Sequence, residues 1–363
     1  MGCQRKPRAN ESVTAREQKG MNSNVRFGLR VVCGVTLSLG LLAGTPSYGQ
    51  DYFKGKQIRV VVGGSVGGGY DTFARTIAAH IGNHIPGQPT FIIQNMNGAG
   101  SLIATNHVYN VGPKDGTEIG ALNPQISTDP MFHPDRAKFD PRKLQWIGSA
   151  LRENHIGIAW SNSPFKTLND AFKNELVVAG SGGSTDQYPL FTNGILGTKF
   201  KVVSGYPGTK EGFLAMERNE VTGNVGITWA SLKATESQWI KDKKVTVFIQ
   251  FGLTKHPELP NVDWIYDYAK NDDDRAAMNL IFAAQEFGRP YAVAPEVPAA
   301  AVAILRKAFD ETMTDKEFLV EAEKRQLELD PVGGTSIQSI MDEMYKASPA
   351  TIERVKAILG DKS

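Results

Sequence analysis

A serine between two glycines is the first feature of the chain that could do chemistry. Gly63, Ser65 and Gly67 form a Gly-x-Ser-x-Gly pattern, the turn that exposes the nucleophile of α/β-hydrolases. In those enzymes the turn lies in mid-sheet, and an earlier strand supplies part of the oxyanion hole. Ser65 instead follows the first strand expected after residue 50, and nothing around His256, the candidate base, marks a triad. A secreted α/β hydrolase using Ser65 is therefore the alternative hypothesis.

The other patterns that could carry chemistry are incomplete. Residues 67–70 match neither the dinucleotide-binding Gly-x-Gly-x-x-Gly nor the phosphate-binding loop, because no Lys-Ser/Thr pair follows. His80 and His84 have the i, i+4 spacing of zinc ligands on a helix, but the glutamate of the metalloprotease motif and a third ligand are missing. The sequence predicts no catalytic residue, no metal site and no cofactor.

Three glycine-rich turns point instead to the capture of an anion without chemistry. The turns at 63–69, 97–100 and 180–184 each follow an expected strand and lead into an expected helix. A helix N-terminus carries about half a positive charge and several unpaired N–H groups, so backbone amides alone can hold a carboxylate. Any single turn could be only a tight connection. Two turns in one lobe and one in the other favour a ligand site.

The elements around these turns alternate between strand and helix. Asp71 lies where it can cap the helix that follows the first turn and organise that turn, and apolar residues recur at helical spacing from Ala74 to Ile85. The alternation predicts parallel, doubly wound α/β sheets, which bind ligands at the carboxyl ends of their strands. Strands are expected at 58–62, 90–94, 117–122, 145–149, 156–160, 176–179, 201–203 and 245–251, and later helices at 298–313, 315–326 and 336–359.

The length of the chain predicts two lobes. A chain of 363 residues exceeds one ordinary domain. We expect lobe 1 to comprise residues 50–145 plus 252–363 and lobe 2 to comprise residues 146–251. A chain that crosses twice between lobes forms a hinge with a cleft.

The first 49 residues have the features of an export signal. Arg26 and Arg30 precede an apolar stretch at 31–43, too short for a membrane span of roughly 20 residues and suited to a signal peptide. Translation is expected to begin at Met21, and cleavage near Gly49 places the mature protein in the periplasm. The mature chain keeps 33 of 40 Lys and Arg and 36 of 38 Asp and Glu, a net charge of −3, and neither cysteine. Nothing in this balance suggests a nucleic-acid partner.

Several short motifs occur in order along the mature chain. They read GGGYDTFAR (67–75), IPGQP (85–89), QNMNGAGS (94–101), PKDGT (113–117), GYPGT (205–209), GRPY (288–291) and AFD (308–310). Together they resemble the substrate-binding receptors of tripartite tricarboxylate transporters, the Bug-type receptors, over almost the whole mature chain. Asn97 departs from the family pattern, where many relatives have proline, and this difference bears on ligand preference.

The resemblance implies a two-lobed fold like that of type II periplasmic binding proteins, with a doubly wound sheet in each lobe and a cleft between them. It implies a monomeric receptor that closes over a small carboxylate, such as a di- or tricarboxylate, and delivers it to membrane permease subunits. Backbone amides from both lobes would hold the ligand. The site residues expected on these grounds are Gly67, Gly68, Gly69, Tyr70, Asp71, Asn97, Gly98, Ala99, Gly100, Ser101, Ser181, Gly182, Gly183, Ser184, Thr185, Tyr206 and Trp229.

Overall fold

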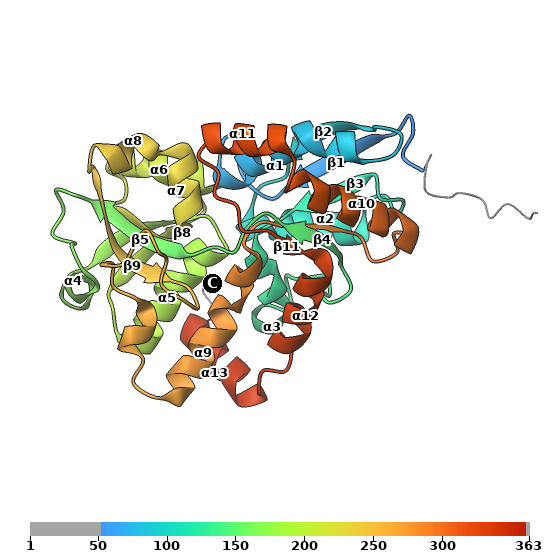
Figure 1. Ribbon diagram of the computed structural model, residues 1–363. Coiled ribbons are helices and arrows are strands. Elements are labelled where there is room, and N and C mark those ends of the chain that lie inside the picture. The colour runs from blue at the N-terminus through green and yellow to red at the C-terminus, as the bar shows by residue number, and fades with distance from the viewer. Residues whose placement is uncertain (1–51, 361–363) are drawn as a thin grey trace, which may run out of the picture. The chain divides into compact units, whose positions relative to one another are not determined.

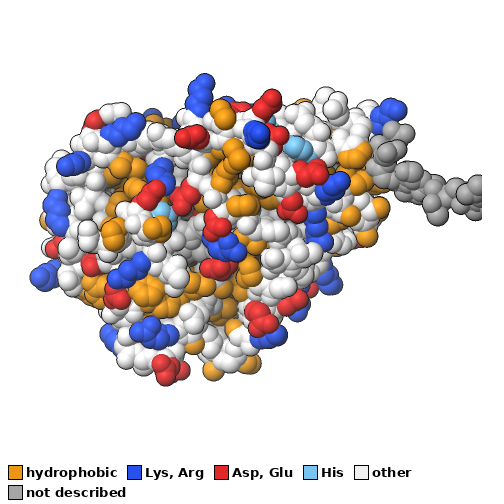
Figure 2. Space-filling view, in the orientation of Figure 1, with side chains coloured by type: hydrophobic (Ala, Val, Ile, Leu, Met, Phe, Trp, Pro, Cys, Tyr) orange, Lys and Arg blue, Asp and Glu red, His pale blue; other side chains and the backbone are white. Residues whose placement is uncertain are grey.

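The computed structural model describes residues 52–360, so the expected signal peptide, its cleavage region and Met21 lie outside the described residues. The described chain has a two-lobed α/β fold built on two mixed β-sheets with flanking helices (Figure 1). None of the described helices has the length and apolar character that a membrane span requires. On the face shown in Figure 2, acidic and basic side chains are intermixed, so this face presents no large field of a single sign.

The first sheet has six strands in the order β11-β4-β10-β3-β1-β2. β1, next to the edge strand β2, pairs in parallel with β2 and β3, while β10 runs antiparallel to β3 and β4. β1 has the apolar, β-branched sequence of a buried strand, as predicted. The strands are β1 (Gln57–Val62), β2 (Thr90–Asn95), β3 (Glu118–Ala121), β4 (Gln145–Ser149), β10 (Pro290–Val293) and β11 (Val332–Gly333).

The second sheet has five strands in the order β7-β6-β8-β5-β9. β6 pairs in parallel with β7 and β8, while β5 runs antiparallel to β8 and β9. The strands are β5 (His155–Trp160), β6 (Leu176–Gly180), β7 (Phe200–Ser204), β8 (Gly223–Thr228) and β9 (Val245–Phe251).

Helices cover both sheets. The helices near the candidate site are α1 (Gly69–Ile81), α2 (Leu102–Asn110), α5 (Ser184–Leu196), α6 (Thr209–Glu217) and α7 (Trp229–Thr235). The others are α3 (Asp129–Phe132), α4 (Leu168–Lys173), α8 (Ser237–Lys241), α9 (Asp272–Phe282), α10 (Ala299–Thr312), α11 (Lys316–Lys324), α12 (Gly334–Met344) and α13 (Pro349–Leu359). Short 3-10 turns lie at Gly82–His84, Ala99–Ser101, Pro124–Ser127, Ile265–Tyr268 and Ala283–Phe287.

Two expectations about the sheets are wrong. The sequence places strand 145–149 in the second unit, but β4 pairs with β10 and β11 in the first sheet. No residue pattern marks where the chain leaves a sheet. The sheets are also mixed rather than purely parallel. A helical crossover between two strands of one sheet makes those strands parallel, but a strand that the chain enters from the other sheet can pair in either direction.

The C-terminal helices also differ from the sequence prediction. The helix expected over 336–359 is broken into α12 and α13, because Ser348 caps a new helix whose first residue is Pro349. Helices α9 and α13 pack against each other and α13 against α5 (Figure 1). They share the core of the second sheet, in which the rings of Tyr188, Phe251 and Phe282 lie 5.0–5.7 Å apart. The last helix therefore does not return to the first sheet.

Two short segments connect the sheets, and they are hydrogen-bonded to each other. Residues 150–154 lead from β4 to β5, and residues 283–289 lead into β10. Glu153 N donates to Gln285 O at 2.9 Å and Gly288 N donates to Leu151 O at 2.8 Å. The crossings thus form a paired ribbon at which the sheets can hinge.

Candidate functional site

The loop after β1 is held by Asp71, the third residue of α1. Asp71 Oδ2 accepts from Gly67 N and from Arg75 Nε, both at 2.8 Å, and Oδ1 accepts from Asn95 Nδ2 at 2.9 Å. Burial alone would raise the pKa of Asp71, but these hydrogen bonds outweigh it and hold the pKa below its ordinary value. The predicted role of Asp71 in organising the glycine turn is confirmed.

The loop after β6 in the second lobe repeats this geometry. Asp186 is the third residue of α5, and its Oδ2 accepts from Gly182 N at 2.9 Å, four residues earlier, as Asp71 accepts from Gly67 N. Burial raises the pKa of Asp186, and hydrogen bonds from Ser204 and Gly182 offset only part of that rise. The two lobes therefore present equivalent glycine loops, each leading into a helix of 13 residues.

The turn before α2 brings the lobes into contact. Gly100 N donates to Ser181 O at 3.3 Å, and Asn97 Nδ2 donates to Pro207 O at 3.3 Å. The contact is close enough to require glycine on both sides: a Cβ on Gly100 would lie 2.3 Å from Gly183 N, and one on Gly182 would lie 2.2 Å from Gly100 N. Both glycines also have positive φ, at 60° and 84°.

A narrow cavity lies between the loops of the two lobes. The centre of a water molecule can occupy about 40 Å³ of it, room for a few waters in this closed arrangement. No charged side chain lines it within the described part of the chain, so backbone amides and hydroxyls set its chemistry. It is lined by Gly63, Gly64, Ser65, Gly68, Gly69, Tyr70, Gly98, Gly100, Asn123, Ser181, Gly182, Ser184, Thr185, Pro207, Gly208, Thr209, Gly226, Ile227, Thr228 and Ser231.

Most of the residues expected at the site lie around this cavity, though not all line it. Nine line it directly: Gly68, Gly69, Tyr70, Gly98, Gly100, Ser181, Gly182, Ser184 and Thr185. Ala99, Gly183 and Tyr206 line a second, adjacent cavity. Gly67, Asp71, Asn97 and Ser101 support the loops, and Trp229 is buried with its Nε1 donating to Glu258. Contact of these 17 residues with a ligand remains a prediction.

The side of the cavity formed by the end of β8 was not predicted from the sequence. Thr228 and Ser231 line it, but β8 was not expected as a strand. Its sequence, GNVGIT, contains two glycines and an asparagine and has no apolar run, although all six residues are buried. The only signal was Thr228 as a helix cap, since its side chain accepts from Ser231 N.

The second cavity lies on the other side of the contact between Gly100 and Ser181 and is larger, with about 310 Å³ open to water centres. Buried Asp129 lines it and accepts from Gln187 Nε2 at 3.2 Å. Burial raises the pKa of Asp129 to about 7, against the charge of Arg136 and the hydrogen bond from Gln187. Because both cavities are bounded by Gly98, Ser181, Gly182 and Pro207, they are parts of one cleft divided by the contact of the loops.

The geometry around Ser65 lacks the features of a nucleophile. Its Oγ is buried and accepts or donates no hydrogen bond among the described residues, so no base activates it. His256, the candidate base, instead contacts Glu328 at 2.9 Å. His80 and His84 face carboxylates of Glu321 and Asp315, at 2.7 and 3.4 Å.

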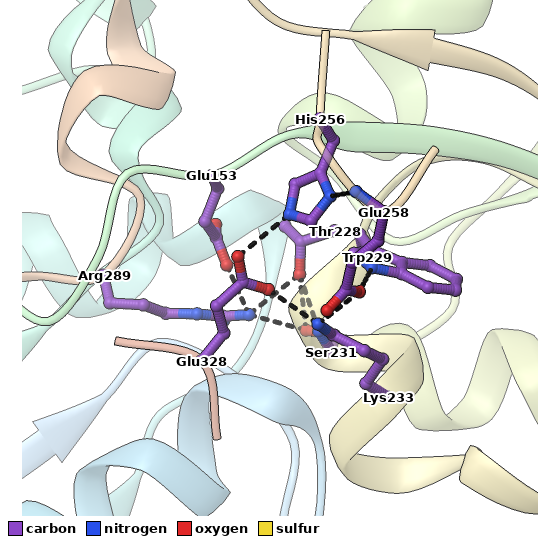
Figure 3. Close-up of polar contacts among 9 residues, drawn as sticks. All are labelled: Glu153, Thr228, Trp229, Ser231, Lys233, His256, Glu258, Arg289 and Glu328. Carbon is purple, nitrogen blue, oxygen red and sulfur yellow. Dashed lines mark hydrogen bonds and ion pairs between the residues drawn. The ribbon is translucent and has the colours of Figure 1, made fainter. Parts of the chain in front are cut away.

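An ion-pair cluster joins the lobes beside the hinge (Figure 3). Lys233 of α7 lies 2.9 Å from Glu328, in the segment before β11, and 2.7 Å from Glu258. Burial would raise the pKa of Glu328, but its contacts with His256 and Lys233 hold that pKa below its ordinary value.

The described chain forms two α/β lobes with a cleft between them, the fold of solved periplasmic binding proteins. No family model and no curated protein matches the chain. Among solved structures, the periplasmic binding protein BugD aligns over 84% of this chain and 98% of its own, with 19% identity and a TM-score of 0.67. MatC from Rhodopseudomonas palustris with bound malate aligns over 85% and 100%, with 16% identity and a TM-score of 0.64. R. palustris Rpa4515 with adipate aligns over 83% and 97%, with 16% identity and a TM-score of 0.64. At these identities the likeness establishes the fold.

Proposed function

We propose that this protein is an extracytoplasmic solute-binding receptor of the tripartite tricarboxylate transporter type, which captures a small carboxylate and hands it to a membrane permease. The observation that carries the proposal is the pair of equivalent glycine loops, one from each lobe, that face each other across a cavity of amides and hydroxyls. Such donors bind an anionic oxygen well but discriminate little between the carbon skeletons that carry it.

The solved structures of the same fold support this ligand class. MatC carries malate and Rpa4515 carries adipate, both of them dicarboxylates. The second cavity adjoins the first at Gly98, Ser181, Gly182 and Pro207, which gives the cleft room for a ligand with two polar ends. We therefore favour a dicarboxylate or a related organic acid over a monovalent anion.

Binding without turnover is the second part of the proposal. Ser65 lines the cavity but has no base in contact, and the similar structures are solute-binding proteins rather than enzymes. We propose export to the periplasm through cleavage near residue 49, action as a monomer, and a hinge at segments 150–154 and 283–289. Delivery to permease subunits then follows from closure of the lobes around the ligand.

A panel of carboxylates tests the function directly. Malate, adipate, succinate and citrate, with arginine as a cationic control, would be screened by thermal shift and then by calorimetry. A ligand at 100 times its dissociation constant stabilises the folded state by about 2.7 kcal/mol. The same samples would be assayed for hydrolysis of esters and lactones. Turnover that Ser65→Ala abolishes would overturn the receptor and support the hydrolase, whereas binding that survives Ser65→Ala without turnover supports the receptor.

A further inference from the structure

A buried arginine stands directly behind the cavity wall. Arg289 is 2% exposed and lies on the segment that crosses into the first sheet. Its guanidinium lies over the rings of Tyr70 and Phe73, 4.2 and 4.8 Å from their centroids. Its Nη2 is 2.7 Å from Glu153 Oε1, and Glu153 lies on the other crossing segment. The ion pair thus joins the two connections of the hinge (Figure 3).

The same nitrogen reaches two hydroxyls of the other lobe. Arg289 Nη2 donates to Thr228 Oγ1 at 2.8 Å and to Ser231 Oγ at 2.7 Å. Both hydroxyls line the cavity, which has no charged side chain of its own within the described residues. Arg289 therefore donates to two hydroxyls that line the cavity, while the carboxylate of Glu153 lies against the same nitrogen.

The hydrogen bonds among these groups limit where the Ser231 proton can go. Thr228 Oγ1 accepts from Ser231 N at 3.0 Å and from Arg289, which occupies both of its lone pairs. The Thr228 proton can go to Ser231 Oγ, 2.8 Å away, or to the carboxylate of Glu153. In either case Thr228 has no lone pair left for the Ser231 proton, and Arg289 already donates to Ser231 Oγ. The Ser231 hydroxyl is therefore able to donate to a ligand.

The Ser231 hydroxyl lies against the first lobe. A Cβ built on Gly69, the first residue of α1, would lie 2.0 Å from Ser231 Oγ, so the hydroxyl lies directly against Gly69. Gly69 and Ser231 both line the cavity. A ligand oxygen at this place would meet the Ser231 hydroxyl from one lobe and the amides at the start of α1 from the other.

We propose that Arg289 is a positioning residue that fixes the Ser231 hydroxyl as a charge-assisted donor to one carboxylate of the ligand. The proposal rests on the proposed carboxylate receptor and deepens it, because it names the side chain that holds one hydroxyl donor of the cavity in place for an anionic ligand. The ion pair with Glu153 holds the guanidinium between the two crossing segments.

The test compares a dicarboxylate with its uncharged diamide. Dissociation constants of malate and malamide, or of adipate and adipamide if adipate is the ligand, would be measured by calorimetry and competition. Hydrogen bonds to charged groups are about twice as strong as those to neutral groups. Ser231→Ala should therefore weaken binding of the dicarboxylate by about tenfold to a hundredfold and weaken binding of the diamide less. Arg289→Lys, which cannot bond both hydroxyls in the same geometry, should also lower the preference for the charged ligand.

The matched control is Ser127→Ala. Ser127 is fully buried and its Oγ donates to Pro124 O at 2.7 Å, but it does not line the cavity. It should leave both dissociation constants unchanged. If Ser231→Ala keeps wild-type affinity for the dicarboxylate, or lowers both affinities by the same factor, the assignment of Ser231 and Arg289 is wrong while the receptor stands. If the wild type binds no carboxylate, the proposed function itself is wrong. Ser231→Ala decides the question if Arg289→Lys does not fold.

Discussion

Lobe closure can be tested by adding one methyl group at Gly100, which contacts the loop after β6. In Gly100→Ala the new Cβ would lie 2.3 Å from Gly183 N and 2.6 Å from Gly183 Cα, where ordinary contacts begin at 3.4 Å. Both neighbours are backbone atoms, which cannot rotate away. The lobes must therefore separate by about 1 Å at this point, given ordinary van der Waals spacing.

The cost follows from that separation. The Gly100 N to Ser181 O bond is already 3.3 Å long, so a further 1 Å breaks it, at about 1 kcal/mol. The steric overlap adds to this loss in the closed state. We expect a total above about 1.4 kcal/mol, which weakens ligand binding at least about tenfold. The lobes should still fold, because the overlap is relieved by opening.

The same substitution at a second glycine serves as a control that separates steric blocking of lobe closure from backbone strain. Gly197, after α5, has φ +88° and nothing within 4 Å of a built Cβ. Gly100→Ala and Gly197→Ala should each lose about 1–2 kcal/mol of stability because both force alanine into the left-handed region. Only Gly100→Ala should weaken binding. It should also abolish the decrease in radius of gyration that small-angle scattering detects when ligand binds the wild type. Wild-type affinity and an unchanged compaction in Gly100→Ala would refute closure through this contact.

Two further predictions concern buried carboxylates. Burial raises the pKa of Asp129 from 3.8 to about 7, so between these pH values the folded state keeps a proton that the unfolded state has released. The free energy of unfolding should therefore fall as pH rises from about 4 to about 7, by up to about 4 kcal/mol from this residue. Urea unfolding from pH 4 to pH 8 should show that slope in the wild type and a shallower one in Asp129→Asn; parallel curves would contradict the assignment. Asp71→Ala removes the acceptor of Gly67 N and Asn95 Nδ2 and should cost about 2–4 kcal/mol at pH 7. Since the pKa of Asp71 is lowered, the difference from the wild type should shrink as pH falls below about 4, and a constant difference would rule out the ionised form as its source.

Local sequence patterns predicted the parts of the site that depend on neighbours along the chain. The glycine turn after β1 was predicted from its run of glycines between a β-branched strand and a helical pattern, and the hydrogen bond that holds it joins Gly67 and Asp71, only four residues apart. The same spacing relates Gly182 and Asp186, and the strand before each turn was recognisable from its β-branched residues. These features depend on backbone geometry over a few residues, which the residue types largely determine.

Tertiary structure decided what lies across the cleft and behind it. β8 is central and wholly buried yet carries two glycines, so its pairing with β5 and β6, rather than its own propensity, makes it a strand. Without β8, nothing along the chain connects Thr228 and Ser231 with Arg289, about 60 residues away. The sequence by itself therefore determined the glycine loops, most of the strands and the two-lobed class. The fold alone placed the buried ion pair of Arg289 and Glu153 behind the cavity wall, because the contacts that hold it there form only when both crossings and both sheets have assembled.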